Sequence, residues 1–352
     1  MKRLLLVGLG ILACQGQALG ADGLPLFKSS EAITATLEVP LSQLLRSSED
    51  ESVEGSFRFE DEGETRTLGV RVSLRGHSRR ELCDRPPLKL DFKRSELTGT
   101  IFEGQNRLKL ATHCQASKRF YGYLQQEYAL YRAYASLTDA AFRVRKVDIA
   151  YHDSEGRKRD RRYPAFLIES DGEVADRLGY TESDLREVAA RDLDPDAVTR
   201  LGLFQYLIGN TDWSLRRGRQ GASCCHNGLL LENPSGAHVI VPYDFDQAGL
   251  IDANYALPAE GLPIDRVRQR LFRGLCTGDG RVEKALRHFN ERRAAIEGEF
   301  PAEGEFRRIN RRARKYIDDF YETVNDPRAL QKRVIDDCRG SPADWLTSSR
   351  PP

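Results

Sequence analysis

Apolar and polar residues alternate over several stretches in the first half of the chain. Alternation with a period of two is the pattern of β-strands that bury one face. Acidic or glycine-containing turns separate the stretches, so the sequence predicts antiparallel strands within residues 24–169. The predicted strands fall within 33–46, 53–75, 88–92, 107–110, 142–151 and 162–169.

One stretch in this half has the helical period instead. Residues 118–136 place apolar side chains three and four positions apart, and Glu127 lies on the same stripe. A carboxylate on a buried stripe is costly unless it is paired, so we expect Glu127 to face a cation. Lys89 and Lys109 are the candidates, because each lies opposite the apolar face of its strand. Tyrosine hydroxyls or an arginine would be the purely structural partners.

The second half of the chain is mostly helical by the same test. Two short apolar runs, 229–231 and 239–241, predict strands within it. With about 330 residues after position 20, two hydrophobic cores are expected rather than one. The predicted helices are 172–179, 181–191, 196–208, 262–275, 281–297, 302–325 and 327–338.

Four oxygen-bearing side chains follow the elements of the stretch from Leu203 to Asp246. A helix, a loop and two short strands deliver Asp212, Asn227, Asp244 and Asp246 to neighbouring loop ends. Carboxylate and amide oxygens suit Mg²⁺ or Mn²⁺ bound together with the phosphates of a nucleotide. In phosphoryl transfer one carboxylate orients or deprotonates the acceptor, while an Asn and another Asp hold metal. The structural alternative is that these residues only form turns, where Asp and Asn are common.

An arginine-rich loop with a single glycine follows one predicted strand, at residues 73–80. Such a loop can bind phosphates through backbone N–H groups and guanidinium groups. Arg75 and Gly76 are therefore candidate nucleotide contacts. The alternative is a solvated hairpin tip, because exposed loops are polar in any case.

The N-terminus has the pattern of a bacterial secretory signal peptide. A basic start at Met1–Arg3 precedes the apolar run Leu4–Leu12 and the small residues around Ala18–Gly20. Loss of residues 1–20 would take the basic count from 54 to 52, against 53 acidic residues, which argues against nucleic-acid binding through bulk charge. We expect an exported protein, periplasmic or secreted. Attachment to the membrane through a lipidated Cys14 stays open, since Ile-Leu-Ala-Cys is an imperfect lipoprotein sequence.

Six cysteines remain beyond the N-terminal region: Cys83, Cys114, Cys224, Cys225, Cys276 and Cys338. An even number in an exported protein predicts disulfides. We expect the first two to pair with each other, and the adjacent two to bond to the last two. Zinc held by the adjacent cysteines, His226 and either Cys276 or His238 is the rival interpretation, although adjacent ligands are poor spacing for a metal site.

Five short motifs carry a resemblance to a known family. The order Gly-Asn-Thr-Asp-Trp, then His-Asn before an apolar strand, then Pro-Tyr-Asp-Phe-Asp resembles the catalytic half of atypical kinases. It is most similar to the spore-coat-protein-H-like (CotH) secreted kinases, and more distantly to HipA-type and lipid kinases. Arg-Gly-x-Ser followed by Pro-Pro-Leu-Lys-Leu-Asp-Phe resembles the glycine turn and lysine-bearing strand that open the CotH-like kinases. The resemblance covers residues 70–250.

The resemblance implies an α+β, two-lobed protein-kinase-like fold. An antiparallel-sheet N-lobe with one long helix would span 24–169, a mostly helical C-lobe 170–338, and a flexible tail 339–352. ATP or another nucleoside triphosphate would bind between the lobes with Mg²⁺ or Mn²⁺. Phosphate would pass to a hydroxyl of a protein or saccharide in the cell envelope.

The resemblance also implies roles for the acidic cluster. Asp212 would orient or deprotonate the acceptor, Asn227 and Asp244 would hold the metal, and Asp246 would be a second ligand or an outer-sphere partner. One spacing departs from the family, because kinases place the Asn about five residues after the loop Asp. Here Asp212 and Asn227 are 15 residues apart. The insert between them must fold away, or the protein is a degenerate kinase.

On the donor side, the resemblance implies that Lys89, ahead of Lys109, holds phosphates and that Glu127 positions it. Arg75 and Gly76 would cover the nucleotide, although a kinase loop usually carries several glycines. Two other classes stay open. One is a non-catalytic binding or assembly module of the cell envelope, and the other is a metal-dependent hydrolase that uses the three aspartates.

Overall fold

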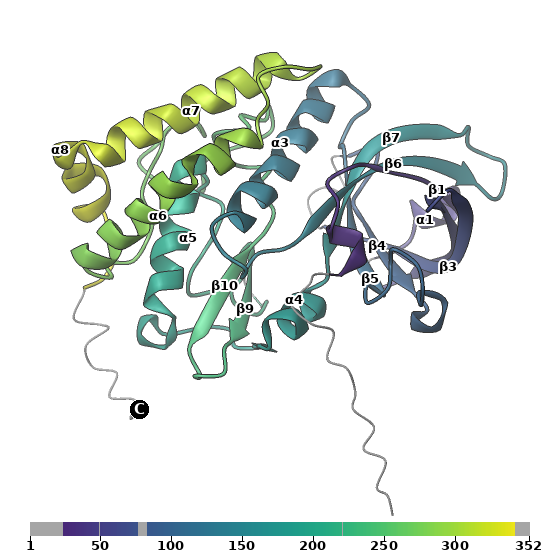
Figure 1. Ribbon diagram of the computed structural model, residues 1–352, viewed down its shortest axis with the longest axis horizontal. Helices are drawn as coiled ribbons and strands as arrows, with labels where there is room; N and C mark the ends of the chain where they lie inside the picture. The colour runs from purple at the N-terminus through teal and green to yellow at the C-terminus, as the bar shows by residue number, and fades with distance from the viewer. Residues whose placement is uncertain (1–23, 49, 77–82, 220, 342–352) are drawn as a thin grey trace, which may run out of the picture.

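The computed structural model describes residues 24–48, 50–76, 83–219 and 221–341. Within these ranges the first half of the chain forms a β-barrel, and the second half forms a mostly helical part beside it (Figure 1). The predicted signal peptide, Cys14 and residues 342–352 lie outside the described residues.

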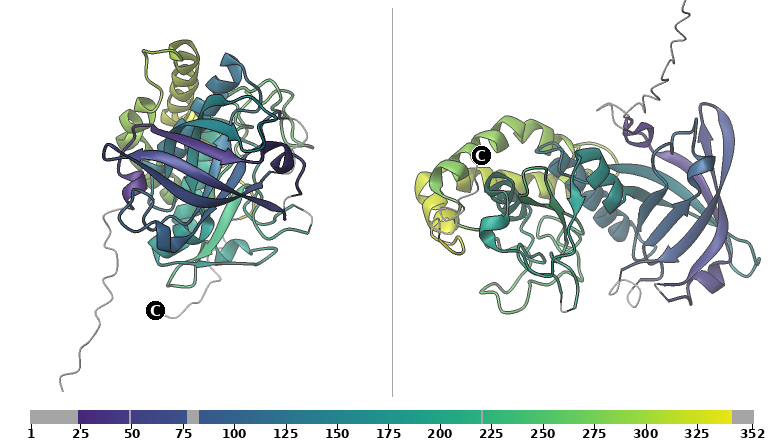
Figure 2. Two further views of the ribbon diagram at one scale, coloured as in Figure 1. Left: turned by 90° about the vertical axis from the view of Figure 1, so that its right-hand side faces the viewer. Right: turned by 90° about the horizontal axis from the view of Figure 1, so that it is seen from below.

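Seven strands close into a barrel in the order β1–β2–β3–β4–β5–β7–β6. Neighbouring strands are antiparallel except β1 and β6, which are parallel and complete the ring (Figure 2). The expected two-lobed protein-kinase-like fold is therefore wrong, since a closed, mixed barrel replaces its open antiparallel sheet. Closure pairs the edges that an open sheet leaves exposed. The strands are β1 (Ile33–Val39), β2 (Ser52–Asp61), β3 (Glu64–Leu74), β4 (Leu88–Phe92), β5 (Arg107–Thr112), β6 (Val144–Asp153) and β7 (Arg161–Glu169).

The alternation seen in the sequence fills the barrel with one face of each strand. In β3 the buried positions Leu68, Val70, Val72 and Leu74 follow a period of two. Four phenylalanine rings in the interior contact one another with centroids 4.7–5.6 Å apart, and three of these four contacts are edge-to-face. The rings are those of Phe57, Phe59, Phe92 and Phe102.

Strand β7 is buried on both of its faces, which joins the barrel to the rest of the molecule. Ala165 and Leu167 belong to the barrel core, whereas Phe166 and Ile168 belong to the core of the helical part. The Phe166 ring packs against Tyr128 of α3 (Lys118–Ala135) with the ring centroids 5.7 Å apart. The long helix predicted at 118–136 is thus confirmed, and its apolar stripe packs on the outer face of the barrel.

The helical part contains a three-stranded sheet with the order β10–β9–β8. Its central helix α5 (Pro195–Ile208) ends at Gly209, whose φ of +63° confirms the C-capping glycine expected from the sequence. The other elements of this part are α4 (Asp171–Leu178), β8 (Thr181–Glu182), β9 (Gly228–Glu232), β10 (His238–Pro242), α6 (Asp279–Gly298), α7 (Arg307–Asn325) and α8 (Pro327–Leu330). Short helical turns are α1 (Leu41–Leu44), η1 (Pro25–Phe27), η2 (Arg94–Glu96), η3 (Ala190–Asp192) and η4 (Gln331–Ile335).

Two predicted helices are wrong. Most of 181–191 is irregular, and its first two residues add the edge strand β8 to β9. Residues 262–275 are irregular as well, although their apolar spacing is helical. In this segment Arg270 and Arg273 donate hydrogen bonds to backbone carbonyls at and just beyond the C-terminus of α5. These bonds hold the segment against the end of that helix, in place of the helical structure that was predicted.

Three disulfides form, of which one was expected. Cys83 bonds to Cys114, as predicted. The second prediction is wrong, because the adjacent cysteines bond to each other and Cys276 bonds to Cys338. Three disulfides are the pattern of an extracellular or periplasmic protein. Within the described ranges, no helix has both the length and the apolar character needed to cross a membrane.

A buried histidine just beyond β5 gives the fold a dependence on pH. The His113 ring lies between the rings of Tyr121 and Tyr163, with centroids 4.8 and 4.5 Å away. Burial, reinforced by the charge of Arg85, lowers the pKa of His113 to about 4. An unfolded histidine binds its proton near pH 6.5, so acid favours the unfolded chain.

We expect His113→Phe to weaken the loss of stability in acid. In the wild type, the contribution of His113 is complete above about pH 6.5 and is lost as the pH falls towards about 4, at a cost on the order of 3 kcal/mol. Urea unfolding of both proteins near pH 7 and pH 4 measures the difference. An equal fall in the free energy of unfolding for both proteins would contradict the assignment.

Candidate functional site

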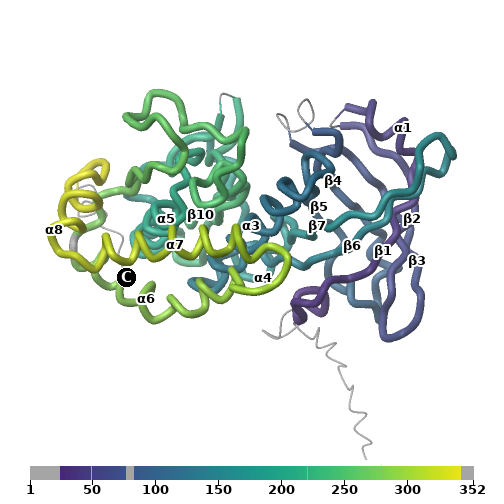
Figure 3. Tube along the Cα trace, turned by 90° about the horizontal axis from the view of Figure 1, so that it is seen from above, coloured from purple at the N-terminus to yellow at the C-terminus, as the bar shows by residue number. Residues whose placement is uncertain are grey.

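A cavity of about 440 Å³ lies between the barrel and the helical part. Its walls come from the ends of β3, β5 and β7, from α3, and from the loops around the β9–β10 hairpin. Figure 3 shows α3 running between the two parts of the molecule. Seven of the nine residues expected at the site line this cavity: Arg75, Gly76, Glu127, Asp212, Asn227, Asp244 and Asp246.

The β9–β10 hairpin places Asn227 beside Asp244. Pro242 pairs with Gly228 at the open end of the hairpin, so Asn227 precedes one strand and Asp244 follows the other. The Tyr243 N–H donates to the Asn227 carbonyl oxygen at 3.1 Å. Asn227 and Asp244 both have positive φ, of 53° and 59°, which Asn and Asp tolerate better than most residues. The two loop ends therefore meet, as the sequence predicted.

The insert between Asp212 and Asn227 folds back so that its two ends meet. The Ser214 N–H donates to the His226 carbonyl oxygen at 3.1 Å. The Asn227 side chain donates from Nδ2 to the Asp212 carbonyl oxygen at 2.7 Å and to Asp212 Oδ2 at 3.0 Å. The 15-residue spacing therefore does not separate the pair. Backbone hydrogen bonds close the insert, and no disulfide joins it to the helical part.

Asp212 is held by partners that favour its charged form. His226 Nε2 lies 2.6 Å from Asp212 Oδ1. Burial alone would raise the pKa of Asp212, but the hydrogen bond and charge of His226, the charge of Arg219 and the hydrogen bond from Asn227 together lower it. Asp212 is thus an ionised carboxylate at neutral pH, fixed in direction by two side chains.

The cavity wall beside Asp244 is aromatic. The Asp244 N–H donates to the Tyr131 hydroxyl at 3.0 Å, and the Tyr131 ring packs against Phe245 with centroids 4.9 Å apart. Burial, followed by the negative charges of Glu127 and Asp244, raises the pKa of Tyr131 well above its usual value, so the hydroxyl stays protonated. Glu127 and Asp246 are 5% and 7% exposed, which makes them buried acids of the same cavity.

Among the described residues, two guanidinium groups line the cavity from opposite parts of the molecule. Arg75 follows β3, where its N–H donates to the Pro87 carbonyl oxygen at 2.9 Å. Gly76 comes next with φ of +84°, a conformation that favours glycine. Arg219 belongs to the insert of the helical part. The cavity therefore combines positive groups at its barrel and insert walls with the acidic cluster.

Neither strand lysine lines this cavity, so the expected pairing of Glu127 with Lys89 or Lys109 is wrong. The two lysines are neighbours across β4 and β5 and line a second cavity of about 700 Å³ with Asp171. The Lys109 ammonium contacts the Asp171 carboxylate at the start of α4. Burial lowers the pKa of Lys109, a shift that Asp171 opposes and the charge of Arg75 reinforces.

The site includes residues that the sequence analysis did not assign. His226 belongs to the His-Asn motif and to the rival zinc site, but neither interpretation paired it with Asp212. The zinc site is wrong because the neighbouring cysteines form a disulfide. The position of His226 directly before Asn227 was the available signal. Tyr131 was placed on the apolar stripe of its helix, and only the folded chain brings its hydroxyl to Asp244. Arg219 had no local signal, since three arginines lie close together in the insert.

The donor atoms of the cavity suit a metal that is shared with a ligand. Among the described residues, no three His, Cys, Asp or Glu side chains are grouped to hold a metal ion by themselves. Mg²⁺ is usually held by one or two carboxylates together with substrate phosphates and water, so a complete protein cage is not required. Asn227 donates through Nδ2, which leaves its Oδ1 as the atom able to coordinate.

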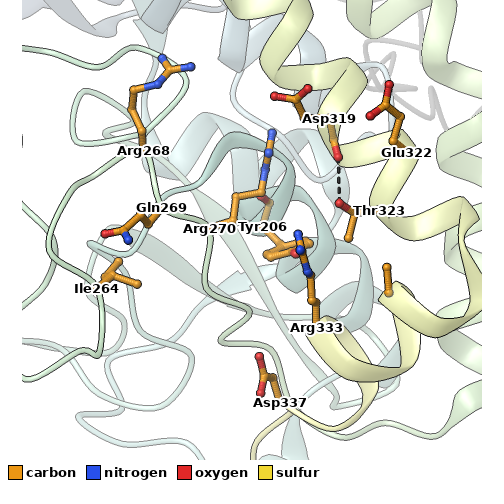
Figure 4. A pocket seen from close by; sticks show the side chains of 11 residues that line it. Tyr206, Ile264, Arg268, Gln269, Arg270, Asp319, Glu322, Thr323, Arg333 and Asp337 are labelled. Atoms are coloured by element: carbon orange, nitrogen blue, oxygen red, sulfur yellow. Dashed lines mark hydrogen bonds between the residues drawn. The ribbon is translucent and has the colours of Figure 1, made fainter.

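A larger cavity, of about 840 Å³, lies elsewhere and contains none of the expected site residues. Figure 4 shows side chains of opposite charge around it, and the Thr323 hydroxyl donates to the Asp319 carbonyl oxygen at 2.8 Å. Arg270 in its wall already donates to the carbonyl oxygens of Tyr206 and Leu207 at 3.1 and 3.4 Å. This cavity is therefore not the candidate site.

We expect His226→Leu to raise the pKa of Asp212. The substitution removes a hydrogen-bond donor and a positive charge but leaves the carboxylate buried, so the charged form loses its main support. Carbon-detected NMR titration of the aspartate carboxyl groups measures the shift, with Asp212→Asn to assign the signal. Arg217→Gln is the matched control, because Arg217 pairs with Glu187 outside the cavity. An unchanged titration in His226→Leu would contradict the hydrogen-bonded pair.

No model of a known protein family matches the sequence, and no curated protein matches it either.

Proposed function

We propose that this protein is a metal-dependent phosphotransferase that moves phosphate from a nucleoside triphosphate to a hydroxyl group of a protein or saccharide. The proposal rests on the lining of one cavity. Asp212, Asn227, Asp244 and Asp246 line it together with Arg75 and Arg219. Phosphoryl transfer needs positive groups for the phosphates, oxygen ligands for a divalent ion and a carboxylate for the acceptor. The lining supplies all three kinds of group.

On the donor side, Arg75 and Arg219 are the groups that bind phosphate oxygens. A guanidinium group forms two parallel hydrogen bonds to a phosphate, which fixes orientation as well as charge. Gly76 leaves the backbone beside Arg75 without a side chain, so phosphates can approach its N–H group. These residues replace the strand lysines in the proposed mechanism, because the lysines line a different cavity.

On the acceptor side, Asp212 orients the attacking hydroxyl by accepting a hydrogen bond from it. The acceptor oxygen forms a bond to the terminal phosphorus as the bond to the leaving diphosphate breaks, and the hydroxyl proton passes to Asp212. His226 and Asn227 hold the carboxylate for this task through hydrogen bonds to both of its oxygens. They are positioning residues, since they act through Asp212.

Asp244, Asp246 and the free oxygen of Asn227 would hold Mg²⁺ or Mn²⁺ together with the phosphates. A bound divalent ion neutralises phosphate charge during transfer. Tyr131 supports this side of the cavity, because its protonated hydroxyl accepts the Asp244 N–H and fixes the backbone there.

The sequence motifs support the same reaction and a location outside the cytoplasm. Six residues of the motifs that resemble CotH-like kinases line the cavity, and this proposal uses them without relying on the fold: Asp212, His226, Asn227, Tyr243, Asp244 and Asp246. We further propose export by the N-terminal signal sequence to the periplasm or beyond, where three disulfides would persist.

A second candidate function is a non-catalytic binding module of the cell envelope. The observation that favours it is the absence of both strand lysines from the described lining of the cavity. Calorimetry with ATP and Mg²⁺ separates the two functions at the first step. Nucleotide binding supports the phosphotransferase, and its absence favours the binding module.

We expect Asp212→Asn and Asp244→Ala to abolish most phosphate transfer. Loss of the acceptor carboxylate costs about 10²–10⁴-fold in rate, and loss of Asp244 removes a metal ligand. Transfer of labelled phosphate from ATP in Mn²⁺ to casein and to neutral tetrasaccharides measures the effect. Asp160→Asn is the control, because Asp160 is exposed on the barrel beside His152. Full activity in Asp244→Ala would overturn the proposed metal site.

We expect Arg219→Gln to weaken ATP binding by about 10-fold, the usual scale of one lost charge-assisted hydrogen bond of about 1.5 kcal/mol. Arg217→Gln should bind ATP as the wild type does, since Arg217 lies in the same insert but pairs with Glu187. Calorimetric titration of each variant with ATP and Mg²⁺ makes the comparison. Equal affinities for both variants would remove Arg219 from the donor side.

A further inference from the structure

One wall of the cavity differs in chemistry from the rest. Phe120 and Tyr255 contribute aromatic rings to it, and Gln115, Gln247 and Asn254 contribute amide side chains. We call these five residues the rim. They carry no charge, whereas the two arginines of the described lining belong to other walls. The rim therefore suits a ligand that is itself uncharged and rich in hydrogen-bonding groups.

Contacts within the rim and with Tyr123 and Leu257 hold four of its five residues in place. The rings of Phe120 and Tyr255 are nearly parallel, at 18°, with centroids 6.1 Å apart. Tyr123 packs edge-on against both rings, and its hydroxyl accepts the Asn254 N–H at 3.2 Å. Gln247 accepts the Leu257 N–H through Oε1 at 3.0 Å, which leaves its NH₂ group as a donor. A site fixed in this way binds without a large ordering cost.

The rim also lies next to the proposed acceptor carboxylate. Hydrogen bonds fix both ends of the segment 254–259. At one end the Asn254 N–H donates to the Tyr123 hydroxyl of α3, and at the other end the Ala259 N–H donates to Thr211 Oγ1 at 3.1 Å. Thr211 directly precedes Asp212. The rim and Asp212 line the same cavity, so a molecule bound on the rim lies in the cavity that the Asp212 carboxylate also lines.

We propose that the rim binds a neutral saccharide and that this saccharide is the phosphate acceptor. An aromatic ring offers a flat apolar surface to the C–H face of a sugar ring, and a tyrosine adds a polar edge. Amide side chains both donate and accept hydrogen bonds, as sugar hydroxyls do. The inference rests on the proposed phosphotransferase function and narrows its substrate class.

The proposed transfer forms one bond to phosphorus and breaks one. A sugar hydroxyl oxygen bonds to the terminal phosphorus of the triphosphate, and the bond from that phosphorus to the bridging oxygen breaks. The nucleoside diphosphate leaves with the bonding electrons, and the hydroxyl proton moves to Asp212. No oxidant or reductant takes part. The products are a sugar phosphate monoester and a nucleoside diphosphate.

The competing acceptor is an acidic peptide, and a different surface would attract it. Arg307, Arg308 and Arg311 are exposed on α7, and no described acidic side chain lies within 4 Å of them. They lie outside the cavity, so they could dock a peptide but would not select the group that enters beside Asp212. The rim, which lines the cavity itself, is the part that selects this group.

The test measures saccharide binding and nucleotide binding separately in the full chain. Neutral tetrasaccharides of glucose, galactose and N-acetylglucosamine are titrated against the wild type, Tyr255→Ala, Asn254→Ala and the control Tyr255→Phe, with saturation-transfer NMR as the readout. We expect at least one tetrasaccharide to bind and to accept labelled phosphate from ATP. Tyr255→Ala should weaken its binding at least fivefold, Tyr255→Phe should keep it within twofold, and ATP affinity should stay unchanged in all variants.

Each other outcome decides one of the two proposals. Phosphate transfer to an acidic serine peptide, with no transfer to any tetrasaccharide, would overturn the saccharide inference and leave the phosphotransferase intact. Saccharide binding that Tyr255→Ala does not weaken would place the acceptor away from the rim and overturn the inference. Saccharide binding without any binding of ATP would support the rim and overturn the phosphotransferase.

Discussion

Burial of both faces of β7 is the constraint on which the arrangement of the molecule depends. Leu167 completes the barrel core on one side, and Phe166 packs on α3 on the other. A strand with apolar side chains on both faces must be covered on both, so the barrel and the helical part cannot separate without exposing one of them. Ile168 continues the outer face of this strand into the cavity wall. The cavity therefore lies at a junction that the hydrophobic effect holds closed.

The end of α5 is a second fixed point, and it holds the loop that carries Asp212. The last carbonyls of a helix lack partners within it and carry partial negative charge. Arg270 donates to the carbonyl oxygens of Tyr206 and Leu207, and Arg273 donates to those of Thr211 and Trp213. Two arginines from an irregular segment thus satisfy the helix end and the loop that carries Asp212. Irregular segments of this length inside a compact protein are uncommon and are usually functional.

Local patterns in the sequence predicted most strands and the long helix α3. Of the nine residues that the sequence suggested for the site, seven line one cavity. They could not predict closure of the barrel, because β1 and β6 pair in parallel across 114 positions, from Ile33 to Val147, and such pairing leaves no local signal. The prediction that Lys89 or Lys109 lines the same cavity was wrong for a related reason. A period of two gives the face on which Lys109 lies, but one face of the barrel borders two cavities, and Asp171 decides which of them the ammonium reaches.

The lowered pKa of Asp212 constrains how the proposed site would work. A general base is most effective when its pKa lies near the operating pH, and His226, Arg219 and Asn227 move Asp212 away from that range. A strong base is not needed where the transition state is loose, because the acceptor hydroxyl then loses its proton late. The hydrogen bonds and charges around Asp212 oppose the free-energy cost of burying a charged carboxylate. The same hydrogen bonds fix the direction of both of its oxygens. Orientation of the hydroxyl, rather than removal of its proton, is therefore the main contribution that this carboxylate would make to the proposed phosphoryl transfer.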